Sequence, residues 1–148
     1  MIINTLKTLF NRDLNQLKVE IDLYQNESII WHTEKEISNS AGNLCLHLIG
    51  NLNTYIGNVF GKTDYIRNRE LEFLLKDIPK SELIQKIEAT QIVVDKALSS
   101  ITEDDLKMEY PLLVFDHKTS TEFMLIHLTT HLAYHLGQIN YHRRLLSQ

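Results

Sequence analysis

The chain ends in the segment TSTEFMLIHLTTHLAYHLGQINYHRRLLSQ, residues 119–148. Thr119 and Glu122 stand in the T-x-x-E arrangement of a capping box, in which each side chain satisfies a backbone amide that has no partner at a helix start. Four of the seven histidines of the chain lie in this segment: His127, His131, His135 and His142. We therefore expect one helix that runs from about Thr119 almost to Gln148.

Three other segments carry apolar residues at steps of three and four, which is the spacing of one helix face. They predict helices at about 2–27, at about 40–61 and from Ser81 to about 101. Small polar residues offer an N-cap near Ser40, Gly61 suits a helix end, and Pro79 suits a helix start. Gly50 and Gly57 lie inside the second helix, where close approach of another helix would explain them.

The segments between these helices, 28–39, 62–80 and 102–118, lack a helical rhythm. Residues 109–115 fit either a short hairpin or an extended loop. Four helices, no strong strand pattern and long connections after the second and third helices predict an all-α four-helix bundle rather than a simple up-down-up-down series. We expect a single domain over residues 1–148.

The composition excludes several classes of function. The net charge of −4 disfavours a nucleic-acid partner. No apolar run approaches the ~20 residues of a membrane span, and residues 1–10 lack the features of a signal peptide. A single cysteine, Cys45, cannot form an intramolecular disulfide and suits a reducing compartment, so we expect a cytoplasmic protein without a membrane partner.

The histidines of the last helix indicate a metal site. Residues four apart share one helix face, so His127 with His131, or His131 with His135, can converge on one ion. All three cannot, because two turns span about 11 Å and metal–nitrogen bonds are ~2.0–2.1 Å long. His47, at the edge of the apolar face of the second helix, is the best third ligand. The alternative is that these are hydrogen-bonded core histidines.

The stretch HLTTHLAYHLGQI, residues 127–139, resembles the last-helix signature of the DinB-like, or YfiT-like, metal-dependent bundle proteins. In that family the histidine pair comes just before a Gly-Gln step. Gly137-Gln138 therefore selects His131 and His135. The third ligand of the family is a histidine early in the second helix, which His47 matches. The resemblance implies an up-down-down-up bundle with a long crossover between helices two and three, commonly a homodimer.

The resemblance also implies a chemistry. Members hold zinc, nickel, iron or manganese, and we expect zinc or nickel first. Better-understood relatives are thiol-dependent S-transferases that use bacillithiol or mycothiol, a thiol-dependent isomerase and hydrolases. We therefore expect a metal-dependent enzyme that acts on a small-molecule substrate, with or without a low-molecular-weight thiol. The alternatives are a non-catalytic metal-binding stress-response protein and a structural dimeric bundle.

Further residues are candidates for the site. His127 either supports the pocket or is a core or interface histidine, and Gln138 either orients a ligand or contacts substrate, or else packs between helices. His142 is expected near a surface. Cys45 should point away from His47, because it lies only two residues before it on a helix.

The segment YIRNRELEF, residues 65–73, is similar to one typical of a small subgroup of these proteins. Its charged residues either form a salt-bridge network that fixes the crossover, which we favour, or give a charged wall for an anionic substrate. They are Arg67, Arg69, Glu70 and Glu72. Trp31 and His32 are expected to cover either the pocket mouth or the core.

Overall fold

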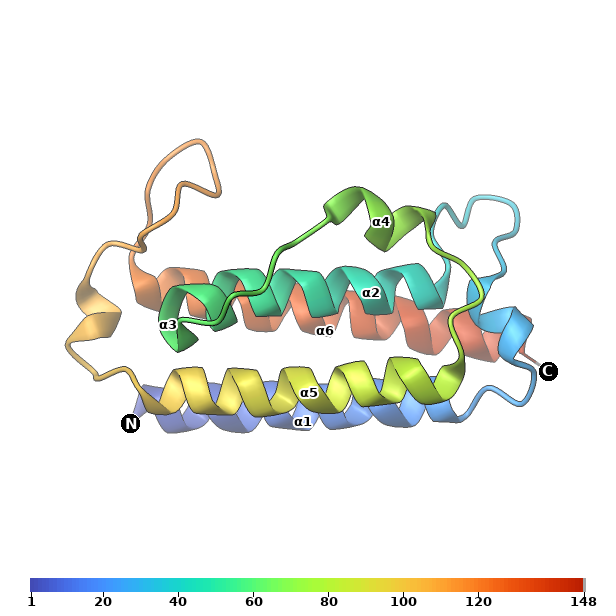
Figure 1. Cartoon of the computed structure of the whole chain (residues 1–148), viewed down its shortest axis with the longest axis horizontal. Helices are drawn as coiled ribbons and strands as arrows, with labels where there is room; N and C mark the ends of the chain where they lie inside the picture. Colours follow the sequence, from blue (N-terminus) through green and yellow to red (C-terminus); the bar gives the residue numbers. More distant parts are fainter. Residues whose placement is uncertain (148) are drawn as a thin grey trace.

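A computed structural model describes residues 1–147 as a bundle of helices (Figure 1). Gln148, the last residue of the predicted domain and last helix, lies outside the described residues. Within residues 1–147 there is no β-strand, only an isolated bridge between Glu109 and Ser120. The expected all-α class is thus confirmed. The α-helices are α1 Ile2–Asp22, α2 Ala41–Leu52, α3 Val59–Gly61, α4 Arg69–Leu74, α5 Lys80–Ser99 and α6 Thr121–Leu146.

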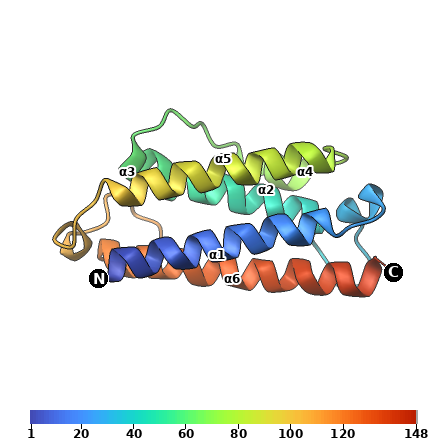
Figure 2. The ribbon, with the colours of Figure 1, turned by 90° about the horizontal axis from the view of Figure 1, so that it is seen from below.

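The four long helices run in two directions. In Figure 1, α1 and α6 run from left to right, whereas α2 and α5 run from right to left. Figure 2 shows the same four helices from below. Helix α1 packs against α5 and α6, and α2 packs against α6 and α5. The connection from α3 to α5 therefore returns along the whole bundle, and α4 within it lies against α2.

The core lies where the apolar faces of the four helices meet. Removing each large side chain of these faces from water contributes about 1.5–3 kcal/mol. The fully or almost fully buried members include Leu6, Phe10, Leu14, Leu17, Ile21, Leu48, Leu52, Leu83, Ile87, Val94, Leu98, Leu125, Leu128, Leu132 and Ile139. The apolar interior of the bundle is thus built from these side chains, and the candidate metal ligands lie only at its edge.

The ends of the first and last helices differ from the predictions. Helix α1 ends at Asp22, and a 3₁₀ segment, Glu27–Trp31, follows it within the expected loop. The capping residue of α6 is Ser120, whose side chain accepts a hydrogen bond from the amide of Phe123. The predicted capping box was therefore one residue too early, because the Thr119 carbonyl instead pairs with the amide of Tyr110.

The second helix extends as far as predicted but changes its winding. Ser40 caps α2, a π-helical turn covers Asn53–Asn58, and α3 ends at Gly61 before a left-handed Lys62 (φ 53°). A Cβ on Gly57 would lie 2.8 Å from a methyl of Val93 on α5, so this glycine does permit close helix approach.

Trp31 belongs to the core rather than to a site. It is buried, and its ring lies so near Gly42 at the start of α2 that a Cβ there would come within 2.6 Å of it. The side chain of His32 remains half exposed. The carbonyl oxygen of this residue accepts a hydrogen bond from His142. Of the two expectations for Trp31, the core is therefore the one observed.

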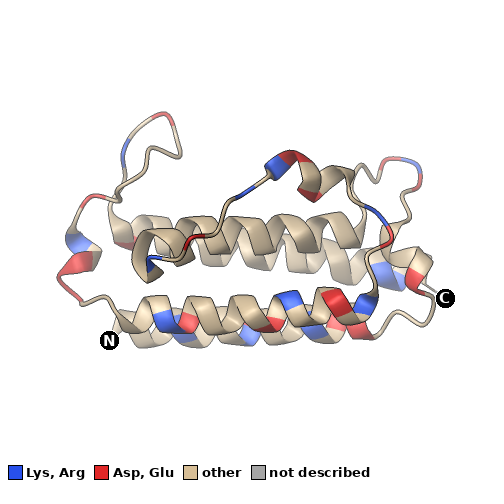
Figure 3. Ribbon diagram, viewed as in Figure 1, with Lys and Arg blue, Asp and Glu red and all other residues tan. Residues whose placement is uncertain are grey.

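Charged residues of both signs are spread along α1 and α5, while few lie on α2 and α6 (Figure 3). Arg67 pairs with Glu72, and Arg143 pairs with Glu20. Among residues 1–147, no helix has both the length and the apolar content that crossing a bilayer requires.

His142 is buried, contrary to the expected surface position. Its Nδ1 accepts a hydrogen bond from the hydroxyl of Tyr24 at 2.6 Å, and its Nε2 donates to the carbonyl of His32 at 2.7 Å. In this tautomer the ring is neutral, and protonation of Nδ1 would require the Tyr24 hydroxyl to accept instead of donate. Burial lowers the pKa of His142 below its ordinary value, and the bond to the His32 carbonyl opposes this only in part.

Stability should therefore fall as the pH is lowered, in part through His142. The ordinary pKa of histidine is ~6.5. As the pH falls from about 7, the unfolded chain therefore takes up a proton on this residue that the folded chain excludes. The free energy of unfolding of the wild type should fall relative to that of His142→Gln between pH 7 and 5, measured by urea denaturation. A difference that stays constant, or that grows as the pH falls, would contradict the buried neutral ring.

Candidate metal centre

His47 on α2 meets His131 and His135 on α6. One ligating atom from each ring lies within 4.8 Å of the other two. The two Nε2 atoms of His47 and His131 are 3.3 Å apart. The ring centroid of His47 is 5.2 Å from that of His131 and 5.3 Å from that of His135. The structure thus brings together the three residues that the sequence singled out.

The backbone explains this convergence. His131 and His135 are one turn apart on the face of α6 that packs against α2. His47 lies beside the apolar stripe of α2, is only 7% exposed and points across to them. His131 and His135 are half-buried, so the cluster is covered by protein on one side and accessible on the other.

Two of the three rings bind a hydrogen-bond acceptor on the side that faces away from the cluster. Nδ1 of His47 lies 3.1 Å from Oε1 of Glu72, and Nδ1 of His135 lies 2.7 Å from Oε1 of Gln138. In the tautomer with the proton on Nδ1, each ring donates outward and turns an unprotonated Nε2 inward. Metal-ligating histidines in proteins are held in this way.

Glu72 reaches His47 because α4 is fixed over α2. Arg67 donates to both oxygens of its carboxylate, at 2.8 Å from Nε and 3.0 Å from Nη2. Asn68 caps α4, and Asn43 donates to the carbonyl of Glu72. Burial alone would raise the pKa of Glu72, but the hydrogen bonds from His47 and Arg67 outweigh it, so the pKa is lowered and the carboxylate is ionised.

Gly50 provides the space for this carboxylate. A Cβ at Gly50 would lie 1.8 Å from Oε2 of Glu72, which no structure could accept without moving the glutamate. The glycine expected to permit helix approach therefore permits the approach of one side chain from α4. Its cost within a helix is about 1 kcal/mol relative to alanine.

Two of the three rings are held in the neutral form at neutral pH. Burial, together with the neighbouring His135 and His47, lowers the pKa of His131 to about 4. Burial also lowers the pKa of His135, against the opposing bond to Gln138. Neutral imidazole is the form that binds metal, so His131 and His135 need no deprotonation before they bind an ion.

Three imidazole ligands fit a first-row divalent ion. Imidazole is a ligand for zinc, nickel, iron and copper alike, so the donor set by itself does not select one metal. Three protein ligands leave a fourth position for water or substrate, which is the arrangement of catalytic rather than structural zinc sites. The cluster can therefore hold a metal ion with an open position.

A protein-family model with the description "Protein of unknown function (DUF1572)" matches residues 2–148. The chain belongs to the DUF1572 family. A search of curated proteins finds no match. All the main helices and all three clustered histidines of this DUF1572 chain lie within the matched range, so the candidate metal centre belongs to the family's domain.

The other predicted residues take different positions in this DUF1572 fold. His127 stays outside the three-residue cluster, with its ring centroid 6.3 Å from that of His131 and 4.8 Å from that of Phe115. The His127 ring therefore lies beside the cluster, next to the rings of Phe115 and His131. Cys45 is buried in the core, where burial raises the pKa of its thiol to about 12, so it offers no nucleophile.

The sequence did not predict the contact between Glu72 and His47. The favoured interpretation of that segment was a salt-bridge network of its four charged residues, of which the structure forms the pair of Arg67 with Glu72. Arg69 and Glu70 are exposed and take no part in the buried pair. One sequence signal was present: a glycine three residues after a histidine on the same helix leaves space for an incoming side chain.

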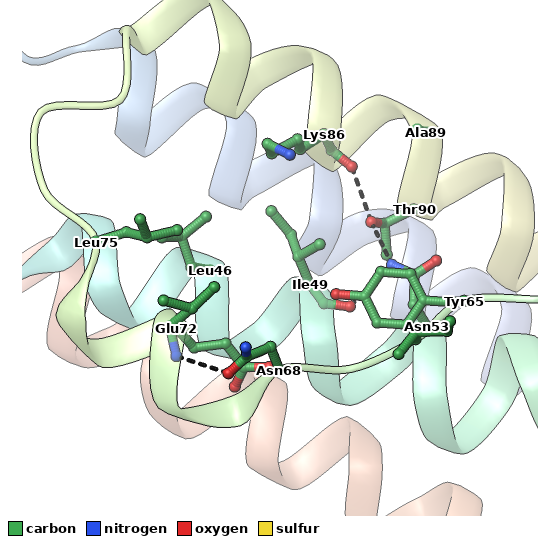
Figure 4. A pocket seen from close by; sticks show the side chains of 12 residues that line it. Leu46, Ile49, Asn53, Tyr65, Asn68, Glu72, Leu75, Lys86, Ala89 and Thr90 are labelled. Carbon is green, nitrogen blue, oxygen red and sulfur yellow. Dashed lines mark hydrogen bonds between the residues drawn. The ribbon is translucent and has the colours of Figure 1, made fainter.

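A separate cavity of about 360 Å³ lies between α2, α4 and α5 (Figure 4). Leu46, Ile49 and Leu75 give it a mainly apolar wall, with Lys86 and Thr90 on the α5 side. Glu72 lines it, but none of the three clustered histidines does. Residue Glu72 of α4 therefore lies between this cavity and the metal centre.

Replacing Gly50 by alanine should weaken metal binding. The added methyl must displace Glu72, which breaks its bonds to His47 and Arg67, and loss of such an outer partner typically costs about 10–100-fold in metal affinity. Zinc competition titrations with a chromophoric chelator measure this change.

Gly137→Ala is the matched control. It also lies within a long helix, beside the cluster, but nothing lies within 4 Å of the position that its Cβ would take. It should leave zinc affinity unchanged and raise the melting temperature slightly. Equal affinities of the two variants would show that the Glu72 contact does not support the centre.

Proposed function

We propose that this protein is a metal-dependent enzyme that acts on small molecules, with a divalent ion held by His47, His131 and His135. The observation that carries the proposal is the convergence of three imidazoles, two of which are oriented from outside by Glu72 and Gln138. An open coordination position and the half-exposed side of the cluster favour catalysis over a purely structural role.

We further propose that the chain is a DinB-like bundle. The directions of α1, α2, α5 and α6, the long crossover and the histidine pair ahead of Gly137-Gln138 all support this assignment. On that basis the ion is zinc or nickel, with iron or manganese as alternatives. The reaction is a thiol-dependent S-transfer to an electrophilic small molecule or a hydrolysis.

In either reaction, a bound ion would supply Lewis acidity and lower the pKa of the thiol or water at its open position. Glu72 and Gln138 hold the ligand rings in place. The ring of Phe73, whose centroid is 5.1 Å from that of His47, lies against this ligand ring. In S-transfer the thiolate attacks the electrophilic carbon, the leaving group departs with the bonding electrons and the thiol proton goes to solvent. A reducing cytoplasm, which the single buried Cys45 suits, would keep such a thiol reduced.

Metal content tests the proposal directly. Untagged protein purified without chelators should carry about one ion per chain, as expected for a single three-histidine site. His131→Ala should carry little or none and should still melt cooperatively, since the apolar core does not depend on this residue. Elemental mass spectrometry gives the content, and calorimetry gives the melting.

The same preparations separate the alternatives. Metal-loaded wild type that conjugates a thiol to a chlorinated or epoxide substrate, while His131→Ala does not, supports an S-transferase. Full metal occupancy without turnover of thiol or hydrolase substrates points to a non-catalytic metal-binding protein. Wild type that takes up no zinc, nickel, manganese or iron would leave a structural bundle.

We also propose a homodimer formed through the outer face of α6. This face carries large exposed apolar side chains at helical spacing beside the metal centre: Phe123, Ile126, Tyr134, Tyr141 and Leu145. A stripe of this kind on a soluble helix commonly marks a protein–protein contact. A second copy can offer the same stripe around a twofold axis.

Tyr141→Lys should therefore shift sedimentation from dimer to monomer, because two ammonium groups would be brought together in an apolar contact. Ile92→Lys is the control, since Ile92 is similarly exposed at 69% but lies on α5. A monomeric wild type, or the same shift in both variants, would be inconsistent with an interface on α6.

A further inference from the structure

His131 differs from the other two rings of the cluster in one respect. Its Nδ1 is buried and has no hydrogen-bond partner in the part of the chain that the structure describes. The equivalent atoms of His47 and His135 bond to Glu72 and Gln138. If Nε2 of His131 faces the ion, its Nδ1 carries a proton, and a buried N–H without an acceptor is unfavourable.

Two unpaired oxygen atoms lie on the facing helix region. Within residues 1–147, the other buried side-chain atoms without a partner are Oδ1 of Asn51 and Oγ1 of Thr54. Asn51 is 7% exposed and lies one turn after His47 on the side of α2 that faces α6. An amide oxygen is an acceptor only, and the Nδ1–H of His131 is a donor only, so each supplies what the other lacks.

The helix geometry places these two groups at similar heights along the bundle. His47 contacts both His131 and His135, so it lies level with the turn between them. Helices α2 and α6 run in opposite directions. Asn51 lies one turn, about 6 Å, further along α2 than His47, and is therefore displaced toward the N-terminal side of His131. Helical side chains lean toward the start of their own helix, which brings the His131 ring to the level of Asn51. Thr54 lies almost another turn away.

We propose that Asn51 is a positioning residue of the metal centre, whose Oδ1 accepts a hydrogen bond from the Nδ1–H of His131 and so holds Nε2 toward the ion. The inference rests on the proposed metal-binding function and extends it to a residue that the sequence pattern did not single out. This bond would give partners to two unpaired buried atoms at once.

The centre then has three outer acceptors of unequal charge. Glu72 is a carboxylate paired with Arg67, whereas Gln138 and Asn51 are neutral amides. A neutral acceptor fixes the orientation of a ring without adding negative charge beside the ion. A bound ion would consequently withdraw electrons more strongly than it would if all three outer acceptors were carboxylates.

Asn51→Leu tests the proposal, because leucine has a similar volume and no acceptor. Its zinc affinity in chelator competition should fall about 10–100-fold, whereas Asn51→Asp should retain affinity. Asn53→Leu is the matched control: Asn53 donates to the carbonyl of Ile49 and to Thr90 on the α5 side, so the variant should lose stability but not affinity. Thr54→Val should keep affinity as well.

Nitrogen NMR of the imidazoles in zinc-loaded wild type gives a readout that needs no variant to fold. It should show His131 protonated on Nδ1, with that proton protected from exchange. Wild-type affinity in Asn51→Leu, an equal loss in Thr54→Val, or a His131 protonated on Nε2 would overturn the role of Asn51 while leaving metal binding intact. A wild type that binds no zinc would instead overturn the proposed function itself, together with this inference.

Discussion

The buried ion pair between Glu72 and Arg67 is the interaction on which the candidate site depends. A carboxylate that is only 6% exposed would be strongly unfavourable without the two-point contact from the guanidinium and the bond from His47. The pair therefore requires the crossover to pass over α2 at this height, requires α4 to present Glu72 inward, and requires a glycine at position 50 to leave space. Few other positions along α2 would satisfy these conditions together.

The helices and the three-histidine cluster were predictable because both depend on local periodicity. The apolar spacing gave the four long helices, and the four-residue step between His131 and His135 required no knowledge of the fold. His47 followed from being a polar ring beside an apolar stripe. Choosing His131 and His135 over His127 needed the resemblance carried by Gly137-Gln138, since spacing alone left both pairs open.

What could not be predicted depends on contacts between distant parts of the chain. His142 was expected near a surface, but Tyr24 and His32 provide the donor and the acceptor that allow its burial. The partner of His47 lies 25 residues away in a six-residue helix too short to have a periodic signal. Helix ends were uncertain by a few residues because Ser120 and Thr119 are equally suitable caps, and only the pairing of Tyr110 with Thr119 distinguishes them.

The crossover has a thermodynamic consequence. Because Arg67 and Glu72 hold the outer nitrogen of His47, local opening of segment 62–79 would release a ligand ring, and by reciprocity a bound ion would resist that opening. If the centre binds an ion, the segment's susceptibility to a protease or to amide hydrogen exchange would depend on whether the ion is present. The long connection would then report, through Arg67 and Glu72, on the metal content of the protein.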